Sequence, residues 1–513
     1  MEMGNRLFML LVLPFLLFYA MPAAAAEKEE RTWEDEAIYF IMVDRFNNMD
    51  PTNDQNVNVN DPKGYFGGDL KGVTAKLDYI KEMGFTALWV TPIFKNMPGG
   101  YHGYWIEEFY QVHPHFGTLG DLKKLPKKTH KRDMKGILEF VANHGGYNHP
   151  WVHDPTKKKW FLPKKENFYW DDPTPLENGW VYGLPDLAQE NPEVQTYLID
   201  AAQWWIKETD IDAYRLDTVR HVPKSFWQEF VKENKSVKKD FFLLCEVWSD
   251  DPRYIADYGK NGIDGFVDYP LYGAVKQSLA RRDASPPPLY DVWEYNKTVY
   301  DRPHLLASFL DNHDTVRFTK LAIDNRNNPI SRIKLAMTYL FTAPGIPIMY
   351  YGTEIAMNGG QDPDNRRLMD FRADPEIIDY LKKIGPLRQE LPSLRRGDFT
   401  LLYEKDGMAV LKRQYQDETT VIAINNTSET QHVHLTNDQL PKNKELRGFL
   451  LDDLVRGDED GYDLVLDRET AEVYKLREKT GINIPFIAAI VSVYVLFLLF
   501  LYLVKKRAKR INE

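Results

Sequence analysis

The sequence predicts an α/β protein with a (β/α)₈ TIM barrel, a smaller antiparallel β-sandwich domain and a C-terminal transmembrane helix. Short apolar runs alternate with amphipathic stretches through most of the 513 residues, which is the pattern of β/α units on a parallel sheet. From about Leu391 the pattern changes to short segments that alternate apolar and polar residues. The segment Ile484 to Val504 is almost purely apolar and has the length of a membrane span.

The barrel is predicted from eight strand-like runs. They are Ala37–Val43, Ala87–Val90, Gly136–Ala142, Ile211–Leu216, Phe241–Val247, Gly265–Val267, Leu305–Leu310 and Ile346–Tyr350. In such a barrel the active site lies at the carboxyl ends of the strands and in the loops that follow them. Polar residues stand at that end of most predicted strands: Asp44 and Arg45, Asn143 and His144, Asp217, Glu246, and Asp311 to Asp314.

Residues 143–198 interrupt the regular alternation. They are loop-like and dense in aromatic residues, His, Pro and Asn, and they are too long for a simple strand-to-helix connection. We therefore expect a loop-rich subdomain inserted after the third strand, between barrel segments 27–142 and 199–390. The β domain is expected over residues 391–478.

The N-terminal residues 1–26 have the pattern of a secretory signal peptide. An apolar run from Leu7 to Phe18 follows Arg6, and the small residues Ala23 to Ala26 precede the charged Glu27. An uncleaved N-terminal anchor is the alternative, but the run is shorter than the roughly 20 residues that span a bilayer. We therefore expect export.

The C-terminal end is predicted to be a membrane anchor over residues 482–504. A basic cluster follows it directly: Lys505, Lys506, Arg507, Lys509 and Arg510. By the positive-inside rule the tail 505–513 stays in the cytoplasm and the preceding domains face the exterior. A buried core helix is the alternative, but core helices are seldom this uniformly apolar.

Composition fits an exported globular protein. The hydrophobic content of 43% and charged content of 27% are ordinary, and the net charge of -10 argues against nucleic acid as a partner. Cys245 is the single cysteine, so an exported form must be stable without an internal disulfide, and bound metal ions become a plausible substitute. We expect a monomer.

Several motifs occur together along the chain. Four are the segments Phe140–His144, Tyr214–His221, Glu246–Trp248 and Phe309–Asp314, and three shorter ones are Tyr101–Trp105, Leu184–Leu187 and Gly345–Pro347. In this order they resemble the signatures of the α-amylase family of glycoside hydrolases, and the resemblance extends from about residue 33 to residue 475. Each motif alone is weak, but their joint occurrence makes coincidence improbable.

The resemblance implies three catalytic carboxyl groups. Asp217 would be the nucleophile, Glu246 the general acid and base, and Asp314 the residue that favours the distorted sugar ring. Retaining cleavage needs two carboxyl groups about 5 to 5.5 Å apart. Arg215 lies two residues before Asp217, hence on the same strand face, where its charge would keep that carboxylate ionised.

The resemblance also implies the substrate contacts. Tyr104 would stack on the sugar at the cleaved position, because sugar rings present apolar C–H faces to aromatic rings. The other expected contacts are His102, His144, Arg215, Arg220, His221, His313, Asp362 and Arg366. In the predicted helix around residue 200, Trp205 falls on the apolar face and is expected in the core, whereas Trp204 is a candidate exposed glucan platform.

Calcium is the cofactor that the resemblance implies, at one or two structural sites built from oxygen ligands. The first set is Asn48, Asp50, Asn53, Asp54, the Gly67 carbonyl and Asp69, with an Asx-rich turn as the alternative interpretation. The second set is Asn143, Asp186 and the His221 carbonyl, which would tie the inserted subdomain to the barrel.

Two positions depart from the family pattern. Glu139 stands where the first signature usually carries Asp, so its extra methylene is expected to shift Arg215 and reduce turnover. Arg220 replaces a common Lys and changes hydrogen-bond geometry beyond the cleavage point.

The sequence therefore predicts a retaining, endo-acting α-amylase that hydrolyses α-1,4-glucosidic bonds of starch, glycogen or maltooligosaccharides. Three alternatives stay open: a cyclodextrin-forming transglycosylase, a cyclodextrin-hydrolysing relative, and a catalytically silent, membrane-anchored glucan-binding homologue. Size argues against the transglycosylase, because only about 90 residues separate the barrel from the apolar segment, room for one β domain. The cyclodextrin-hydrolysing relatives usually begin with an extra N-terminal domain. The presence of all three acids argues against the silent homologue.

Overall fold

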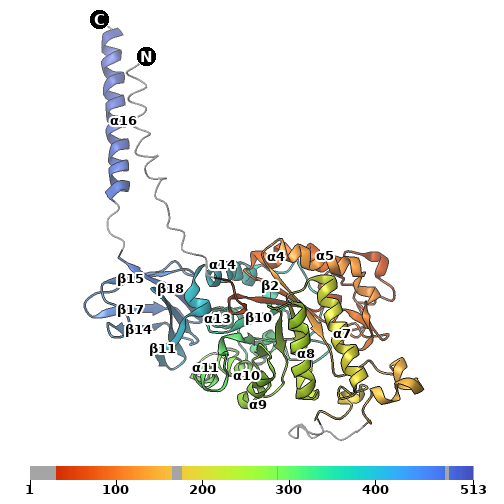
Figure 1. Cartoon of the computed structure of the whole chain (residues 1–513). Helices are drawn as coiled ribbons and strands as arrows, with labels where there is room; N and C mark the ends of the chain where they lie inside the picture. The colour runs from red at the N-terminus through yellow and green to blue at the C-terminus, as the bar shows by residue number, and fades with distance from the viewer. Residues whose placement is uncertain (1–29, 165–175, 286, 480–483, 512–513) are drawn as a thin grey trace.

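The computed structural model describes residues 30–164, 176–285, 287–479 and 484–511 (Figure 1). The predicted signal peptide lies outside the described residues, as do residues 165–175 of the predicted inserted subdomain.

Eight parallel strands close into a barrel in the order β1-β10-β9-β8-β7-β6-β5-β2, which confirms the predicted (β/α)₈ architecture. Their bounds are β1 Ile38–Ile41, β2 Ala87–Val90, β5 Lys135–Phe140, β6 Ala213–Leu216, β7 Phe242–Cys245, β8 Gly265–Val267, β9 Leu306–Phe309 and β10 Ile346–Tyr350. Almost every strand residue is buried, because helices cover the outer face and side chains fill the interior. The third strand of the barrel ends at Phe140 rather than Ala142, so Asn143 and His144 stand in the loop that follows it.

Most of the helices form the outer layer of the barrel (Figure 1), whereas the short α2, Val43–Phe46, is fully buried. The other bounds are α3 Leu70–Ala75, α4 Leu77–Glu82, α5 Leu119–His130, α7 Pro192–Thr209, α8 Lys224–Val237, α9 Pro252–Ala256, α10 Tyr269–Leu279, α11 Pro287–Val299, α12 Phe318–Asp324, α13 Pro329–Thr342, α14 Glu376–Glu390 and α15 Pro392–Arg396. Helix α7 illustrates how the sequence sets their ends. The Asn191 side chain accepts a hydrogen bond from the Glu193 amide at its start, and Asp210 takes a left-handed conformation at its end.

Two irregular regions lie at the carboxyl end of the barrel. The hairpin of β3 Phe94–Asn96 and β4 Ile106–Val112 follows β2. The predicted insertion after β5 is loop-rich, with the short 3₁₀ turns η4 Pro150–His153, η5 Pro155–Trp160 and η6 Val181–Gly183. Single bridges join residues 144 and 186 and residues 161 and 187, so the insertion folds back toward the strand that it follows.

The β domain confirms the predicted antiparallel architecture. A six-stranded sheet has the order β11-β12-β13-β18-β15-β16, and β14 pairs with β17 in a second sheet. The bounds are β11 Asp398–Lys405, β12 Met408–Tyr415, β13 Glu418–Asn425, β14 Gln431–Thr436, β15 Lys444–Gly448, β16 Leu454–Arg456, β17 Gly461–Leu466 and β18 Thr470–Glu478. Apolar residues from both sheets form one separate small core, and in β17 the buried Leu464 and Leu466 flank the exposed Val465.

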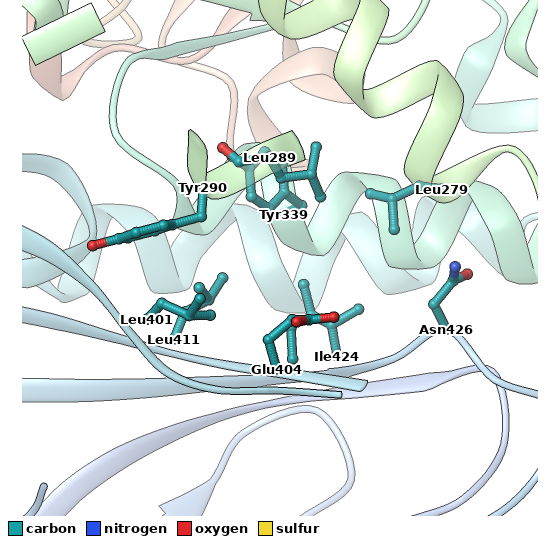
Figure 2. A pocket seen from close by; sticks show the side chains of 10 residues that line it. Leu279, Leu289, Tyr290, Tyr339, Leu401, Glu404, Leu411, Ile424 and Asn426 are labelled. Carbon is teal, nitrogen blue, oxygen red and sulfur yellow. The ribbon is translucent and has the colours of Figure 1, made fainter. Parts of the chain in front are cut away.

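The two domains pack closely together. Figure 2 shows Leu279, Leu289 and Tyr339 of helices α10, α11 and α13 above Leu401, Leu411 and Ile424 of the β domain. The space left between them is about 20 Å³, close to the size that a single water molecule needs. Beside this cavity, the buried Asn426 amide donates to the carbonyl oxygens of Ser278 at 2.8 Å and Ala284 at 2.9 Å. The β domain is therefore held against the barrel by both apolar packing and buried hydrogen bonds.

Helix α16, Ile484–Ile511, extends away from the globular part of the molecule (Figure 1). Its segment Ile487–Ala508 is long and apolar enough to cross a membrane, and none of that segment is buried against the rest of the protein. Cys245 is buried and free, in accord with a fold that uses no internal disulfide.

Candidate active site

A cleft of about 790 Å³ opens at the carboxyl ends of the barrel strands. Asp217 and Glu246 each follow a strand directly, β6 and β7, and their backbone amides remain in the barrel ladder by donating to Phe140 and Leu216. Asp314 stands in the loop after β9. All predicted catalytic and substrate-contacting residues except Arg215 line this cleft: His102, Tyr104, His144, Asp217, Arg220, His221, Glu246, His313, Asp314, Asp362 and Arg366.

Arg215 lies beneath the cleft and joins the acids. Its side chain is 1% exposed, and its guanidinium contacts Asp217 Oδ1 at 2.7 Å and Glu246 Oε1 at 2.7 Å. The same guanidinium also contacts the carboxylate of the buried Glu139. One cation thus fixes the relative positions of two cleft carboxylates from below, which leaves their upper sides open to a ligand.

Glu246 is held by two further hydrogen bonds. The Tyr269 hydroxyl donates to Oε1 at 2.9 Å, and the Thr218 amide donates to Oε2 at 3.0 Å. Tyr269 in turn stacks on Trp248, with ring centroids 5.1 Å apart. Both oxygens of Glu246 are therefore oriented by neighbours from other strands and loops.

The electrostatics of the cleft follow from burial. Burial raises the pKa of Asp217 above its ordinary value, the charge of Arg215 opposes this shift, and the charge of Glu246 adds to it. The charge of Arg215 thus acts in the expected direction, toward the ionised form of Asp217, and desolvation by burial acts against it. Burial also raises the pKa of Asp314 to about 6, against the opposing charge of Arg366.

The histidines and Tyr104 form one connected group. His313 Nε2 lies 2.7 Å from the Tyr104 hydroxyl and 3.2 Å from Asp314 Oδ2. Arg366 donates to Asp314 Oδ1 at 3.2 Å and pairs with Asp362 at 3.1 Å. Burial lowers the pKa of His102, His144 and His313, which keeps these rings neutral near pH 7.

Two ring nitrogens in this group are buried and have no partner among the described residues: Nε2 of His144 and Nδ1 of His313. A buried polar group without a hydrogen bond costs about 1 to 3 kcal/mol. Since both side chains line the cleft, hydroxyl groups of a bound ligand are the natural partners.

The comparisons with known proteins agree with this geometry. Residues 40–383 match the family model described as alpha amylase, catalytic domain, and residues 397–474 match the alpha-amylase C-terminal domain. The chain belongs to the α-amylase family of glycoside hydrolases.

Members of the α-amylase family with different activities are similar to this chain. The solved structure of an alpha-amylase from Geobacillus thermoleovorans, complexed with acarbose, is 91% identical, covers 88% of this chain and 100% of its own, and has a TM-score of 0.86. CldA, a cyclomaltodextrin glucanotransferase with a three-domain distribution, is 30% identical over 86% of this chain and 99% of its own, with a TM-score of 0.77.

Curated relatives show the same spread. A beta/alpha-amylase of Paenibacillus polymyxa is 34% identical over 83% of this chain. The matched region is only 36% of the length of that protein. A cyclomaltodextrinase of Thermoanaerobacter pseudethanolicus is 32% identical over 80% of this chain and 74% of its own length. The existence of a three-domain glucanotransferase removes the argument from chain length against that activity.

Several lining residues were missed by sequence reasoning, among them Trp105, Tyr147, Tyr182 and Trp248. Tyr182 is 78% exposed and Trp248 is 46% exposed, so both present ring surface at the cleft. Trp248 and Tyr182 could have been expected at the site from the sequence. Trp248 ends the third family motif, and Tyr182 lies two residues before the motif that begins at Leu184.

Glu139, which departs from the α-amylase family pattern, makes two local contacts that account for its longer side chain. The longer side chain contacts Arg215 through one oxygen and accepts a hydrogen bond from Trp89 Nε1 through the other, at 2.9 Å. Arg215 still reaches both Asp217 and Glu246. Glu139 thus has an indole partner while Arg215 remains in contact with both acids. At the other departure, the guanidinium of Arg220 donates to the backbone oxygen of Trp248.

The predicted calcium set Asn143, Asp186 and His221 is brought together. The side-chain oxygen of Asn143 faces only acceptors, Asp186 Oδ1 and the His221 carbonyl oxygen, and a rotated amide would donate to them at 3.2 and 2.9 Å. Asp186 Oδ2 is buried and has no partner among the described residues. Three converging oxygens with an orphaned carboxylate atom fit a hard cation.

The other predicted calcium set is brought together only in part. The Asn48 amide donates to Asp54 Oδ1 at 2.9 Å and to Oδ2 at 2.8 Å. A Cβ on Gly67 would stand within 3 Å of Asn48 Nδ2 and of Asp54 Oδ1. Asn53 has side-chain atoms with no partner among the described residues. Asp50 instead pairs with Lys71, and Asp69 accepts backbone amides of residues 49, 50 and 72.

The described residues contain no group of three or more His, Cys, Asp or Glu side chains placed to hold a metal. Trp205 is fully buried, as predicted for the core. Trp204 is half-buried and packs edge-on against Trp205 and Tyr110 rather than standing free.

Proposed function

We propose that the protein is a retaining, endo-acting α-amylase that hydrolyses α-1,4-glucosidic bonds in starch, glycogen or maltooligosaccharides. The observation that carries the proposal is the single guanidinium of Arg215, in contact with both Asp217 and Glu246 on the floor of the cleft. Carboxylates that share one guanidinium suit the separation of about 5 to 5.5 Å in retaining enzymes better than the roughly 6.5 to 9.5 Å of inverting ones.

In this proposal Asp217 attacks the anomeric carbon and Glu246 protonates the leaving glycosidic oxygen. Water, deprotonated by Glu246, then releases the sugar from Asp217, so the α configuration is retained. The Tyr269 and Thr218 donors hold the Glu246 carboxyl toward the cleft during both proton transfers.

Asp314 and its neighbours bind the reacting sugar. Arg366 and His313 orient the Asp314 carboxylate, and the free ring nitrogens of His144 and His313 are available to hydroxyl groups. Hydrogen bonds that strengthen as the ring distorts lower the barrier. Tyr104 offers its ring to the apolar face of the same sugar.

Calcium is proposed as a structural cofactor held by Asn143, Asp186 and the His221 carbonyl. Bound there, it would supply positive charge between converging oxygens. These ligands come from the loop after β5, the end of the insertion and the turn after β6, so they tie the insertion to the barrel beside Asp217.

Endo action is supported by the shape of the cleft, which is open and carries exposed aromatic rings. A cyclodextrin-active enzyme is the second candidate, favoured by the similarity to a three-domain cyclomaltodextrin glucanotransferase. A silent glucan-binding role is disfavoured because Asp217, Glu246 and Asp314 are all present and converge on the cleft.

We further propose that the protein is exported and anchored by helix α16, with the catalytic domain outside and the tail 505–513 in the cytoplasm. The length and composition of the segment Ile487–Ala508 and the basic residues that follow Val504 support this orientation.

Activity on two substrates tests the proposal. The full chain in mild detergent should release maltooligosaccharides from soluble starch with far higher kcat/KM than it opens β-cyclodextrin, and it should form no cyclodextrin. Asp217→Asn should lower kcat on starch by about 10³-fold or more. Cyclodextrin as the preferred substrate or as a product would favour the second candidate, and an inactive wild type would favour the binding protein.

A further inference from the structure

A second hollow lies where the β3–β4 hairpin and the inserted segment meet the first half of helix α7. It is a shallow, open depression with a volume of about 490 Å³. Its walls come from β4, η5 and the first half of helix α7, which runs along the outside of the barrel beside α8 (Figure 1). It shares no lining residue with the catalytic cleft.

Aromatic rings form one side of this outer hollow. Tyr197 is the centre of the group, with its ring centroid 5.5 Å from that of Tyr110 and 5.4 Å from that of Trp160. Tyr110 and Tyr197 are half-buried, so part of each ring is open to a ligand, whereas Trp160 is only 5% exposed and supports them from below. The Trp160 indole is fixed by its hydrogen bond to Glu193 at 2.9 Å.

Polar groups form the other side. Glu193, Thr196 and Asp200 are exposed and repeat at intervals of three and four residues, so they share one face of α7 with Tyr197. Asp200 has no hydrogen-bond or ion-pair partner in the part of the chain that the structure describes. An open ring beside unengaged carboxylate and hydroxyl groups is what a sugar needs, since its C–H face stacks and its rim of hydroxyls donates.

We propose that the outer hollow is a second binding site for an α-glucan chain. The inference rests on the α-glucan substrate proposed for the cleft. The inserted segment links the two places, because Trp160 belongs to the hollow and Tyr147 and Tyr182 of the same segment line the cleft. A polymer held at the hollow raises the local concentration of chain at the cleft, whereas a short oligosaccharide gains nothing.

The test fills the hollow without touching the cleft. Thr196→Arg places a long side chain from an exposed helical position into the hollow, and Gln195→Arg is the matched control one residue away, outside the lining. For the full chain in detergent, Thr196→Arg should weaken binding to insoluble starch at 4 °C by about two- to tenfold. Asp200→Asn should weaken it less, and kcat/KM on maltopentaose should stay at the wild-type value for all three variants.

Each result decides the matter. Unchanged starch binding by Thr196→Arg, or an equal loss in Gln195→Arg, overturns the proposal and leaves the aromatic group as packing for the insertion. Loss of starch binding by Thr196→Arg alone, with an unchanged thermal midpoint, supports it. If wild type binds starch through the hollow but does not cleave maltopentaose, the hydrolytic function fails while the second binding site stands.

Discussion

Glu139 departs from the family pattern, and Glu139→Asp separates its contact with Arg215 from its contact with Trp89. One Glu139 oxygen contacts Arg215 and the other accepts from Trp89 Nε1 at 2.9 Å. A side chain shorter by one methylene cannot keep both contacts. The charge-assisted contact with Arg215 is the stronger, so we expect Asp to keep the arginine and to abandon the indole.

The cost follows from the surroundings of Trp89. Its side chain is 3% exposed and stacks on Phe40 with ring centroids 3.6 Å apart, so the indole has no freedom to find another acceptor. An unsatisfied buried donor costs about 1 to 3 kcal/mol. Glu139→Asp should therefore lower the free energy of unfolding by that amount while kcat on starch stays within about threefold, because Arg215 still holds Asp217 and Glu246.

A double-mutant cycle with Trp89→Phe is the assay. Phe removes the donor, so Glu139→Asp should cost little in that background, and the coupling energy between the two positions should be at least about 1 kcal/mol. Unfolding by guanidinium at equal m-values and kcat on starch are measured for all four proteins. The reasoning fails if Glu139→Asp leaves stability unchanged and lowers kcat more than tenfold, since Asp would then have kept the indole and lost the arginine.

Four further predictions follow from the site. Glu246→Gln should lower kcat on starch by about 10²-fold or more, and a leaving group that needs no protonation should restore much of the first chemical step; equal loss on both substrates would contradict the acid role. Because burial raises the pKa of Asp217, kcat/KM should fall as pH drops through a value above the usual ~3.9 of Asp, and an acidic limb at or below that value would contradict the desolvation argument. Chelation should lower Tm, and in Asn143→Ala the chelator should have a much smaller effect; an equal fall in both proteins would place the cation elsewhere. Trp248→Ala should change the distribution of oligosaccharide products more than it changes starch binding at 4 °C, and an unchanged distribution would deny Trp248 a place in the cleft's sugar contacts.

The fold was predictable because its signals are local. Each barrel strand is a short, almost wholly buried apolar run. The eight runs could therefore be predicted from the sequence, and the predicted ends differ from the observed strand ends by no more than two residues. The acids could be placed because Asp217 and Glu246 follow strands directly and therefore meet at one edge of the barrel.

Contacts between distant segments were beyond the sequence. One partner of Glu139 is Trp89, fifty positions away on another strand, and no sequence pattern joins the two. The oxygen-rich segment from Asn48 to Asp54 was predicted to form one ligand set together with Asp69. In the structure Asp50 forms an ion pair with Lys71, and Asp69 accepts hydrogen bonds from backbone amides. The sequence shows which possible metal ligands lie close together along the chain. It does not show which of these side chains are already bound to other residues in the fold.

The anomeric form of the first product tests the central claim most directly. Full chain in detergent is mixed with maltoheptaose and followed by proton NMR before mutarotation equalises the anomers. The shared contact of Asp217 and Glu246 with Arg215 predicts that the new reducing ends appear first as the α anomer, by double displacement. First appearance as the β anomer would mean inversion, and Asp217 could not then be the nucleophile.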